Sequence, residues 1–265
     1  MAQIHQFSVV DPQAQLAQDV VVGPFCVIGP NVTIGAGTVL ISHVNVNGVT
    51  TIGERNRIYP NASIGCDPQD KKYAGEATRL EIGDDNVIRE HVTISTGTVQ
   101  DHSLTKVGNR NLFMANVHIA HDCQVGDDTI LANNVGLAGH SHVGDGAIMG
   151  GQSGLHQFNR VGCGAMVGAG SILVQDVPPY VICNGSPVEP HGLNVVGLRR
   201  HGYGLKQLNV LKEAYKIIYR EGLTVAEAQE KLSELMQNEP EMAQHVQMMR
   251  DFIAASQRGI IRPKA

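Results

Sequence analysis

Residues 107–137 read VGNRNLFMANVHIAHDCQVGDDTILANNVGL, and an apolar residue returns at every sixth position of this stretch. The same period continues to residue 173, runs through residues 4–64 and recurs briefly over residues 82–94. A period of six fits neither an amphipathic helix nor an alternating strand. It is typical of a parallel β-helix built from hexapeptide repeats, in which three hexads make one triangular coil with the apolar residue inside. The runs predict a prism of roughly eight to nine coils, about 40 Å tall.

The composition agrees with a narrow core of medium-sized aliphatic side chains. The 265 residues include no Trp, only five Phe and 30 Gly. Gly often follows the apolar residue of a hexad, as at Gly53 and Gly126. We expect these glycines to supply positive φ at tight corners.

Charge and cysteine content exclude several classes of protein. A net charge of −5 without long basic runs argues against nucleic acid as a partner. Five cysteines without C-x-x-C spacing predict neither a disulfide framework nor a cysteine-based zinc site. The sequence contains no signal peptide and no apolar stretch long enough for a transmembrane segment, so we expect a cytoplasmic protein.

Two polar, turn-rich interruptions break the period, near residues 66–80 and 96–106. We interpret them as loops that leave a corner of the prism, where loops of repeat proteins often build the binding face. The expected β-helix, with these loops, covers residues 1–190.

A small helical domain is expected over residues 191–265. Its first helix carries Leu205 to Tyr219, and Thr224 with Glu227 forms a capping box for the second. A third helix is predicted from residues 239–240 to near Gly259. The exposed faces of an open β-helix need partners, so we expect three prisms to pack side by side as a homotrimer.

Histidines cluster in the third run, with His121 and His140 19 residues apart and His140 and His156 16 apart. Since one coil is about 18 residues long, these three should lie on one corner or face in successive coils. Such a cluster suits acid–base catalysis or a metal site, and polar residues at solvent-exposed turns are the alternative.

A general base is the interpretation that we favour over a metal site. His121 precedes Asp122, whose carboxylate could fix the imidazole tautomer. Adjacent residues of a strand point to opposite faces, so a direct contact requires a corner. The three-residue spacing of His118 and His121 does not match the paired metal ligands of β-helical carbonic anhydrases.

Residues 116–123, NVHIAHDC, closely resemble the UDP-N-acetylglucosamine acyltransferases, and the resemblance covers nearly the whole chain. The other matching segments are GPFCVIGP at 23–30, PQDKKYAGE at 68–76, EIGDDNVIRE at 81–90, LTKVG at 104–108, ILANN at 130–134, LAGH at 137–140, LHQF at 155–158, QDVPPYVI at 175–182 and GLNVVGLRR at 192–200.

The resemblance implies a left-handed β-helix and a homotrimer with active sites between subunits. It implies transfer of an (R)-3-hydroxyacyl chain to the glucosamine 3-hydroxyl of UDP-GlcNAc, the first step of lipid A biosynthesis. The donor would be acyl carrier protein with its phosphopantetheine thioester, and no separate cofactor or metal is implied.

The resemblance also assigns roles to individual residues. His121 would be the general base, assisted by Asp122, and the backbone N–H of Gly139 would hold the oxyanion. Ala169 matches the position that closes the acyl groove and sets chain length. The residues that match substrate-binding positions are Asp70, Lys72, His118, His140, His156, Gln157, Asn194 and Arg200.

Three positions depart from the pattern of the family: Thr96, Val196 and His201. They leave open a 3-amino sugar as acceptor, which would give an amide, and a metal-dependent or purely binding β-helix is a further alternative. An acidic carrier protein would favour a basic docking surface on the C-terminal segment. The candidate residues are Arg199, Arg200, Lys206, Lys212, Lys216 and Arg220.

Overall fold

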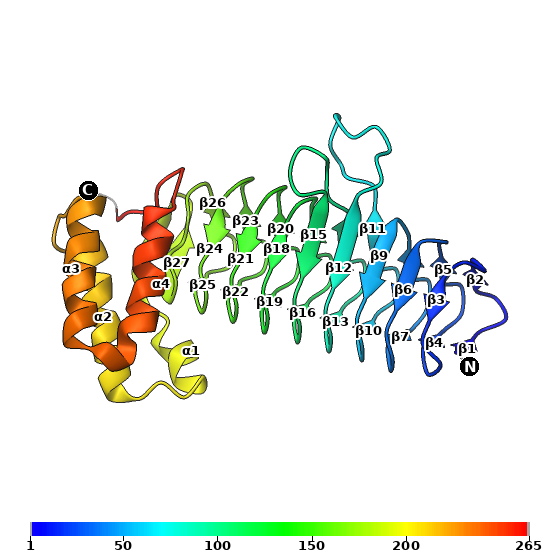
Figure 1. The fold of residues 1–265 in the computed structure, drawn as a ribbon, viewed down its shortest axis with the longest axis horizontal. Helices are drawn as coiled ribbons and strands as arrows, with labels where there is room; N and C mark the ends of the chain where they lie inside the picture. Colours follow the sequence, from blue (N-terminus) through cyan, green and yellow to red (C-terminus); the bar gives the residue numbers. More distant parts are fainter. Residues whose placement is uncertain (1, 264–265) are drawn as a thin grey trace.

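The chain, described over residues 2–263 in a computed structural model, forms a long prism of parallel strands with a helical bundle at one end (Figure 1). Three sheets, A, B and C, make the walls of this left-handed β-helix, and their strands pair in parallel except for the last pair of sheet A. Sheet A contains β1 (Gln3–Ile4), β4 (Val21–Val22), β7 (Val39–Leu40), β10 (Arg57–Ile58), β13 (Val87–Ile88), β16 (Leu112–Phe113), β19 (Ile130–Leu131), β22 (Ile148–Met149), β25 (Met166–Val167), β27 (Val181–Gly185) and β28 (Val188–Leu193).

Sheet B contains β2 (Val9–Val10), β5 (Val27–Ile28), β8 (Asn45–Val46), β11 (Ser63–Cys66), β14 (Thr93–Ser95), β17 (His118–Ile119), β20 (Gly136–Leu137), β23 (Gly154–Leu155) and β26 (Ile172–Leu173). Sheet C contains β3 (Gln15–Leu16), β6 (Val32–Ile34), β9 (Val49–Ile52), β12 (Arg79–Ile82), β15 (Leu104–Val107), β18 (Gln124–Val125), β21 (His142–Val143) and β24 (Arg160–Val161).

The hexapeptide period correctly predicts the core. The last residue of almost every strand from β4 onward points inward and is buried, from Val22 to Leu173. Equivalent residues of successive coils are paired, as Phe113 is with Leu131, and thus stack in columns. Ile4, in the first coil of the described residues, is 47% exposed because no coil within residues 2–263 covers its outer end. The predicted fold class is confirmed.

The reason expected for the glycines after the apolar residues is wrong for most of them, although Gly65 does have a positive φ, of 72°. Gly53 does not have positive φ, whereas bulky residues such as Phe25, with φ of 60°, take that conformation at corners. A Cβ atom on Gly53 would lie 2.8 Å from the carbonyl carbon of Gly83, and one on Gly23 would lie 1.8 Å from the oxygen of Ile41. Glycine is required here because the next coil comes too close for a side chain.

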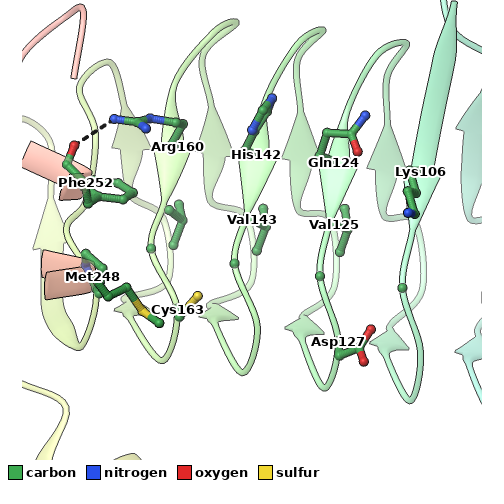
Figure 2. Close-up of a pocket in the computed structure, with 16 residues that line it drawn as sticks. Lys106, Gln124, Val125, Asp127, His142, Val143, Arg160, Cys163, Met248 and Phe252 are labelled. Carbon is green, nitrogen blue, oxygen red and sulfur yellow. Dashed lines mark hydrogen bonds between the residues drawn. The ribbon is translucent and has the colours of Figure 1, made fainter. Parts of the chain in front are cut away.

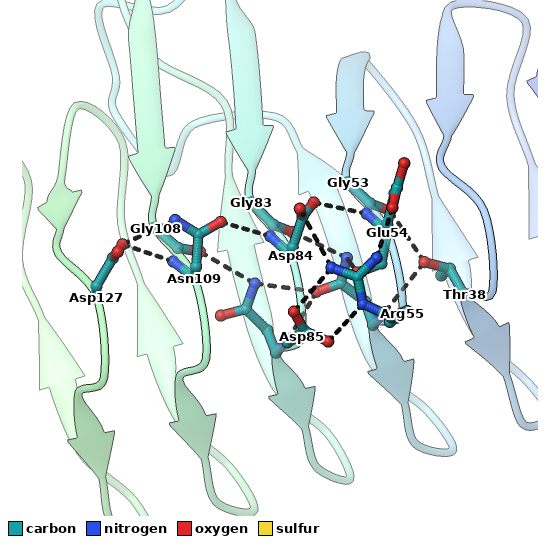
Figure 3. Close-up of polar contacts among 12 residues, drawn as sticks. Thr38, Gly53, Glu54, Arg55, Gly83, Asp84, Asp85, Gly108, Asn109 and Asp127 are labelled. Atoms are coloured by element: carbon teal, nitrogen blue, oxygen red, sulfur yellow. Dashed lines mark hydrogen bonds and ion pairs between the residues drawn. The ribbon is translucent and has the colours of Figure 1, made fainter.

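Polar side chains form ladders along the corner between sheets C and A (Figure 3). On its surface, Asp84 Oδ1 accepts a hydrogen bond from the N–H of Glu54, and Asn109 Oδ1 accepts one from Asp84. Inside the same corner, Asn86 donates to Asn56 Oδ1 and to the Gly108 carbonyl. These bonds satisfy backbone groups of the turns, which would otherwise be buried without partners.

We predict that Asn86→Ala lowers the free energy of unfolding by at least about 2 kcal/mol, because several buried partners lose their hydrogen bonds. Asn86 is fully buried and also accepts from the N–H of Asn111. Chemical denaturation would measure the loss, with the exposed Asn31→Ala as the control. Equal stability of the two variants would contradict the role of this ladder.

The helical end consists of α1 (Val195–Arg200), α2 (Leu205–Tyr219), α3 (Val225–Asn238), the 3₁₀ turn η1 (Pro240–Met242) and α4 (Ala243–Ala254). The three predicted helices are α2, α3 and η1–α4, and Thr224 with Glu227 forms the predicted capping box. The short helix α1 was not predicted, and the last helix ends at Ala254 rather than near Gly259. No helix within residues 2–263 is both long and apolar enough to cross a membrane.

Arg160 fastens the helical end to sheet C (Figure 2). Its guanidinium lies 2.9 Å from the buried carboxylate of Asp176, donates to the carbonyl of Phe252 and lies 4.4 Å from the centre of the Phe252 ring. Ser256 donates to the same carboxylate. These contacts hold the segment that follows α4 against the prism.

Candidate active site

The site lies at the corner where the chain passes from sheet B to sheet C, which we call the BC corner. Its turns include residues 120–123, 138–141 and 156–159, each between a strand of sheet B and one of sheet C. The two long loops, residues 67–78 and 96–103, leave the prism at the same corner and extend to one side of it (Figure 1). Residues far apart in the sequence therefore converge here.

One side-chain position recurs in successive turns of the BC corner. It is occupied by Asp122, His140 and Phe158, with φ of 59°, 61° and 65°. This left-handed conformation turns the chain sharply, so that neighbouring side chains no longer point to opposite faces. The Nδ1 atom of His121 consequently lies 2.9 Å from Asp122 Oδ2, as the pairing of a base with a carboxylate requires.

Asp122 is 2% exposed and is surrounded by donors. The hydroxyl of Thr98 donates to Oδ2 at 2.6 Å, and the N–H of Thr98 donates to Oδ1 at 2.9 Å. These donors compensate the cost of burying a carboxylate. Asp122 accepts its other side-chain hydrogen bonds from N–H and O–H groups. We therefore expect His121 to donate its Nδ1–H to Asp122, which leaves the Nε2 lone pair facing the cleft.

The His121 ring lies against the backbone of Gly139. A Cβ atom at residue 139 would lie 2.5 Å from Cε1 and 2.6 Å from Nε2 of His121. The N–H of Gly139 has no hydrogen-bond acceptor within residues 2–263. A free donor therefore lies beside the imidazole.

Two adjoining hollows meet at His121. The first lies on the outer surface of sheet B and is lined by residues that include His118, Gly139 and His156. The second lies under the loops and includes Asp70, Lys72, His140 and Gln157. The structure thus brings together eight of the residues predicted from the sequence: Asp70, Lys72, His118, His121, Gly139, His140, His156 and Gln157.

His118 is held as a hydrogen-bonding group rather than as a cation. Its Nδ1 lies 2.7 Å from the Thr93 hydroxyl. Burial, and secondarily the charge of His121, lower the pKa of His118. In the loop, Asp70 Oδ1 accepts from the N–H of Lys72, which shapes the turn that carries both side chains.

The expected stack of three histidines is only partly right. The rings of His121 and His140 meet edge to face with centroids 5.1 Å apart. The next ring in the stack belongs to Phe158, whose centroid is 4.4 Å from that of His140. His156 comes before Phe158 in the same turn and is therefore not part of the stack. Its Nδ1 lies 3.4 Å from an Arg258 nitrogen of the C-terminal tail.

Asn194, Arg200 and Ala169 do not join the cluster within one chain. Asn194 caps α1 and donates to the carbonyl of Gly164, in a turn from sheet C to sheet A. Ala169 is exposed in the turn between β25 and β26 and does not line either hollow.

The three departures from the family pattern also have defined places. Thr96 is buried and accepts a hydrogen bond from the Thr78 hydroxyl, which joins the bases of the two loops. Val196 and His201 are exposed at the helical end, with α1.

Sequence reasoning missed Asp101, Phe158 and Gln257, all of which line the hollow under the loops. Asp101 belongs to a loop that the sequence predicts to be part of a binding face, but nothing in its spacing indicates where its side chain points. Gln257 lies about a hundred residues after the cluster and reaches it only because the tail folds back.

A metal ion is the alternative occupant of the cluster. The ligand atoms of His121, Asp122 and His140 lie within 4.8 Å of one another, which is close enough to bind one. The hydrogen bonds of Asp122 with Thr98 and His121 account for the same arrangement without an ion. Metal analysis of the purified protein distinguishes the two.

The fold and the site define a transferase of the hexapeptide-repeat class. The family described as bacterial transferase hexapeptide matches residues 1–41 and 104–139. The family described as UDP-N-acetylglucosamine O-acyltransferase, domain 2, matches residues 176–261. An acyl-[acyl-carrier-protein]–UDP-N-acetylglucosamine O-acyltransferase of Thiobacillus denitrificans is 56% identical over 264 residues, covering 99% of this chain and 100% of the relative. The chain belongs to the UDP-N-acetylglucosamine O-acyltransferase family.

Solved structures agree with this placement. LpxA from Acinetobacter baumannii is 50% identical with a TM-score of 0.94, covering 98% of this chain and 99% of that one. UDP-N-acetylglucosamine acyltransferase of Francisella novicida is 42% identical with a TM-score of 0.95, covering 98% and 94%.

We predict that Gly139→Ala displaces the His121 ring, because the new methyl group would overlap Cε1 and Nε2 of the ring. A crystal structure of the variant should show the contact between His121 and Asp122 broken. The matched control is Gly136→Ala, where a Cβ would meet nothing within 4 Å. An unmoved ring in Gly139→Ala would contradict the steric role of this glycine.

Proposed function

We propose that the chain transfers an (R)-3-hydroxyacyl group from acyl carrier protein to the glucosamine 3-hydroxyl of UDP-GlcNAc, in the first step of lipid A biosynthesis. The observation that carries the mechanism is the pair formed by His121 and the buried Asp122, with Nδ1 and Oδ2 2.9 Å apart. It leaves Nε2 of His121 available at the junction of the two hollows.

His121 acts as the general base. Nε2 takes the proton of the sugar 3-hydroxyl as its oxygen attacks the thioester carbonyl, and the imidazolium that forms keeps its Nδ1–H on the Asp122 carboxylate. When the tetrahedral intermediate collapses, the C–S bond breaks and the thiolate of the carrier arm takes up the proton. The products are the ester and the free thiol.

The backbone N–H of Gly139 stabilises the oxyanion. It has no acceptor within residues 2–263, and it lies next to the base, where the carbonyl oxygen of the thioester becomes negative. A donor that is already oriented needs no rearrangement as the charge develops.

The outer surface of sheet B offers a channel for the acyl chain. His118, Gly136, Gly154 and Ile172 are paired in register on four successive strands. The two glycines leave a furrow that leads from the base toward the apolar Ile172. Ala169 lies in the turn before Ile172, and we assign the end of the chain to this region.

A homotrimer would close this channel. The outer surface of sheet A carries a stripe of partly exposed apolar side chains on successive strands, paired in register. The stripe consists of Val87, Leu112, Ile130, Ile148, Met166 and Ile182. An apolar stripe on the outside of a water-exposed sheet favours a protein partner.

A threefold cyclic assembly requires two different surfaces on each chain. If sheet A of one prism covers sheet B of the next, the corner between sheets A and B lies on the threefold axis. The corner between sheets C and A, near Asn194 and Arg200, then meets the BC corner of the neighbour. We infer that the two residues complete the neighbour's site with Asp70, Lys72, His140, His156 and Gln157, which supports the binding roles proposed for them.

The C-terminal helices provide the docking surface for the acidic carrier protein. Arg199, Arg200, Lys212 and Arg220 are exposed. Lys206 and Lys216 are paired with Glu241 and Glu213, so they contribute less free positive charge. We also propose the cytoplasm as the place of reaction, since five cysteines without C-x-x-C spacing suit a reducing compartment.

We predict that the wild-type protein converts UDP-GlcNAc and a mixture of 3-hydroxyacyl carrier proteins into one acylated sugar nucleotide, detected by mass spectrometry. His121→Ala should fold normally and lose about 10²–10⁴-fold in rate, as expected for removal of a general base. The control is His142→Ala, on the outside of sheet C. Full activity of His121→Ala would refute the assignment, and product only from a 3-amino sugar would revise the acceptor.

We predict that Ile130→Glu yields monomers, because it places a charge in the middle of the apolar stripe. Sedimentation velocity of the wild type should show a trimer. Gln124→Glu, on the preceding strand β18 of sheet C, should leave the trimer intact. A monomeric wild type, or a trimeric Ile130→Glu, would show that this stripe does not hold the assembly together.

A further inference from the structure

A second aspartate–histidine pair lies beside the one that the reaction uses. Asp101, in the loop between β14 and β15, places its Oδ2 atom 2.8 Å from Nδ1 of His140. The rings of His140 and His121 are nearly perpendicular, at 88°. The general-base mechanism employs only His121 and Asp122, so the pair of Asp101 and His140 has no role in it.

The ring of His140 is enclosed on three sides. Phe158 stacks on its face at an interplanar angle of 9°, His121 meets it at an edge, and Asp101 bonds Nδ1. Phe158 is 52% exposed and has a positive φ, both of which are unfavourable for a bulky aromatic residue. These contacts leave His140 one orientation.

The second nitrogen of His140 is available to a ligand. Within residues 2–263 no protein group forms a hydrogen bond with its Nε2. The side chain is only 13% exposed, and it lines the hollow that also contains Asp70, Lys72 and Gln157. An unpaired nitrogen in such a position requires a polar partner when substrates exclude water.

The loop that carries Asp101 is anchored to the catalytic pair. Thr98 donates twice to Asp122, and the N–H groups of Asp101 and Ser103 both donate to the Thr98 carbonyl. Burial alone would raise the pKa of Asp101, but the hydrogen bond from His140, with smaller electrostatic effects of the neighbouring groups, lowers it overall. An ionised Asp101 can only accept, so Nδ1 of His140 is the donor.

We propose that Asp101 is a positioning residue that fixes the orientation and tautomer of His140, so that Nε2 accepts a hydrogen bond from a hydroxyl group of a bound substrate. The inference rests on the proposed function, which supplies hydroxyl groups on the sugar and on the 3-hydroxyacyl chain. It gives the loop of residues 96–103 a part in substrate recognition that acts through His140.

The test compares Asp101→Ala and Asp101→Asn with Val99→Ala, an exposed position of the same loop. Asp101→Ala should lower kcat/KM by about 10-fold to 100-fold, the effect of losing one charge-assisted hydrogen bond. Asn retains a carbonyl oxygen that accepts from Nδ1–H, so Asp101→Asn should recover most of the loss. KM values for the two substrates show which of them bonds His140.

A second background separates positioning from a merely structural role. In His140→Gln, the additional change Asp101→Ala should have no further effect on kcat/KM, because the group that Asp101 orients is absent. An equal loss in both backgrounds, or full activity of Asp101→Ala, would overturn the inference.

An absence of acyl transfer by the wild type would refute the proposed function itself. The positioning role of Asp101 can still be tested in that case. A crystal structure of Asp101→Ala then tests the positioning directly. A rotated His140 ring with an unchanged Phe158 supports the role of Asp101, and a ring that stays in place refutes it.

Discussion

The close stacking of backbone coils is the constraint on which the rest of the structure depends. Parallel pairing sets neighbouring strands about 4.8 Å apart, and at the turns the approach leaves no space for a Cβ on Gly23 or Gly53. Because every coil must repeat the path of the one below, each corner position recurs at intervals of about one coil. Asp122, His140 and Phe158 are neighbours for this reason and not because of any local motif.

The core could be predicted from the sequence because its geometry is periodic. One inward residue per hexad is enough to locate β1–β26, and the change to a helical period locates α2, α3 and α4. The short helix α1 escaped prediction because its six residues contain little periodic signal. The reason why glycine follows the apolar residue of a hexad was also predicted wrongly for most of these positions. A side chain there would clash with the next coil, and this clash depends on the stacking distance, which a single coil does not reveal.

The candidate site was predictable to the extent that it follows the coil. The adjacency of His121 and His140 came from their spacing, but a shift of two residues was enough to put Phe158 instead of His156 in the stack. Side chains outside the coil, such as Asp101 and Gln257, depend on loop and tail conformations that carry no period. The positions of Asn194 and Arg200 relative to the cluster concern a second chain, so one sequence could indicate them only through resemblance.

Asp122 links the stability of the corner to its chemistry. A buried carboxylate needs several donors, and the nearest ones come from Thr98, at the start of the second loop. The group that orients His121 therefore also holds the loop that carries Asp101 toward His140. Since both histidines depend on one buried carboxylate, a substrate hydroxyl bonded to His140 would share its support with His121. An insertion at this corner thus adds contacts to the site without disturbing the coil beneath it.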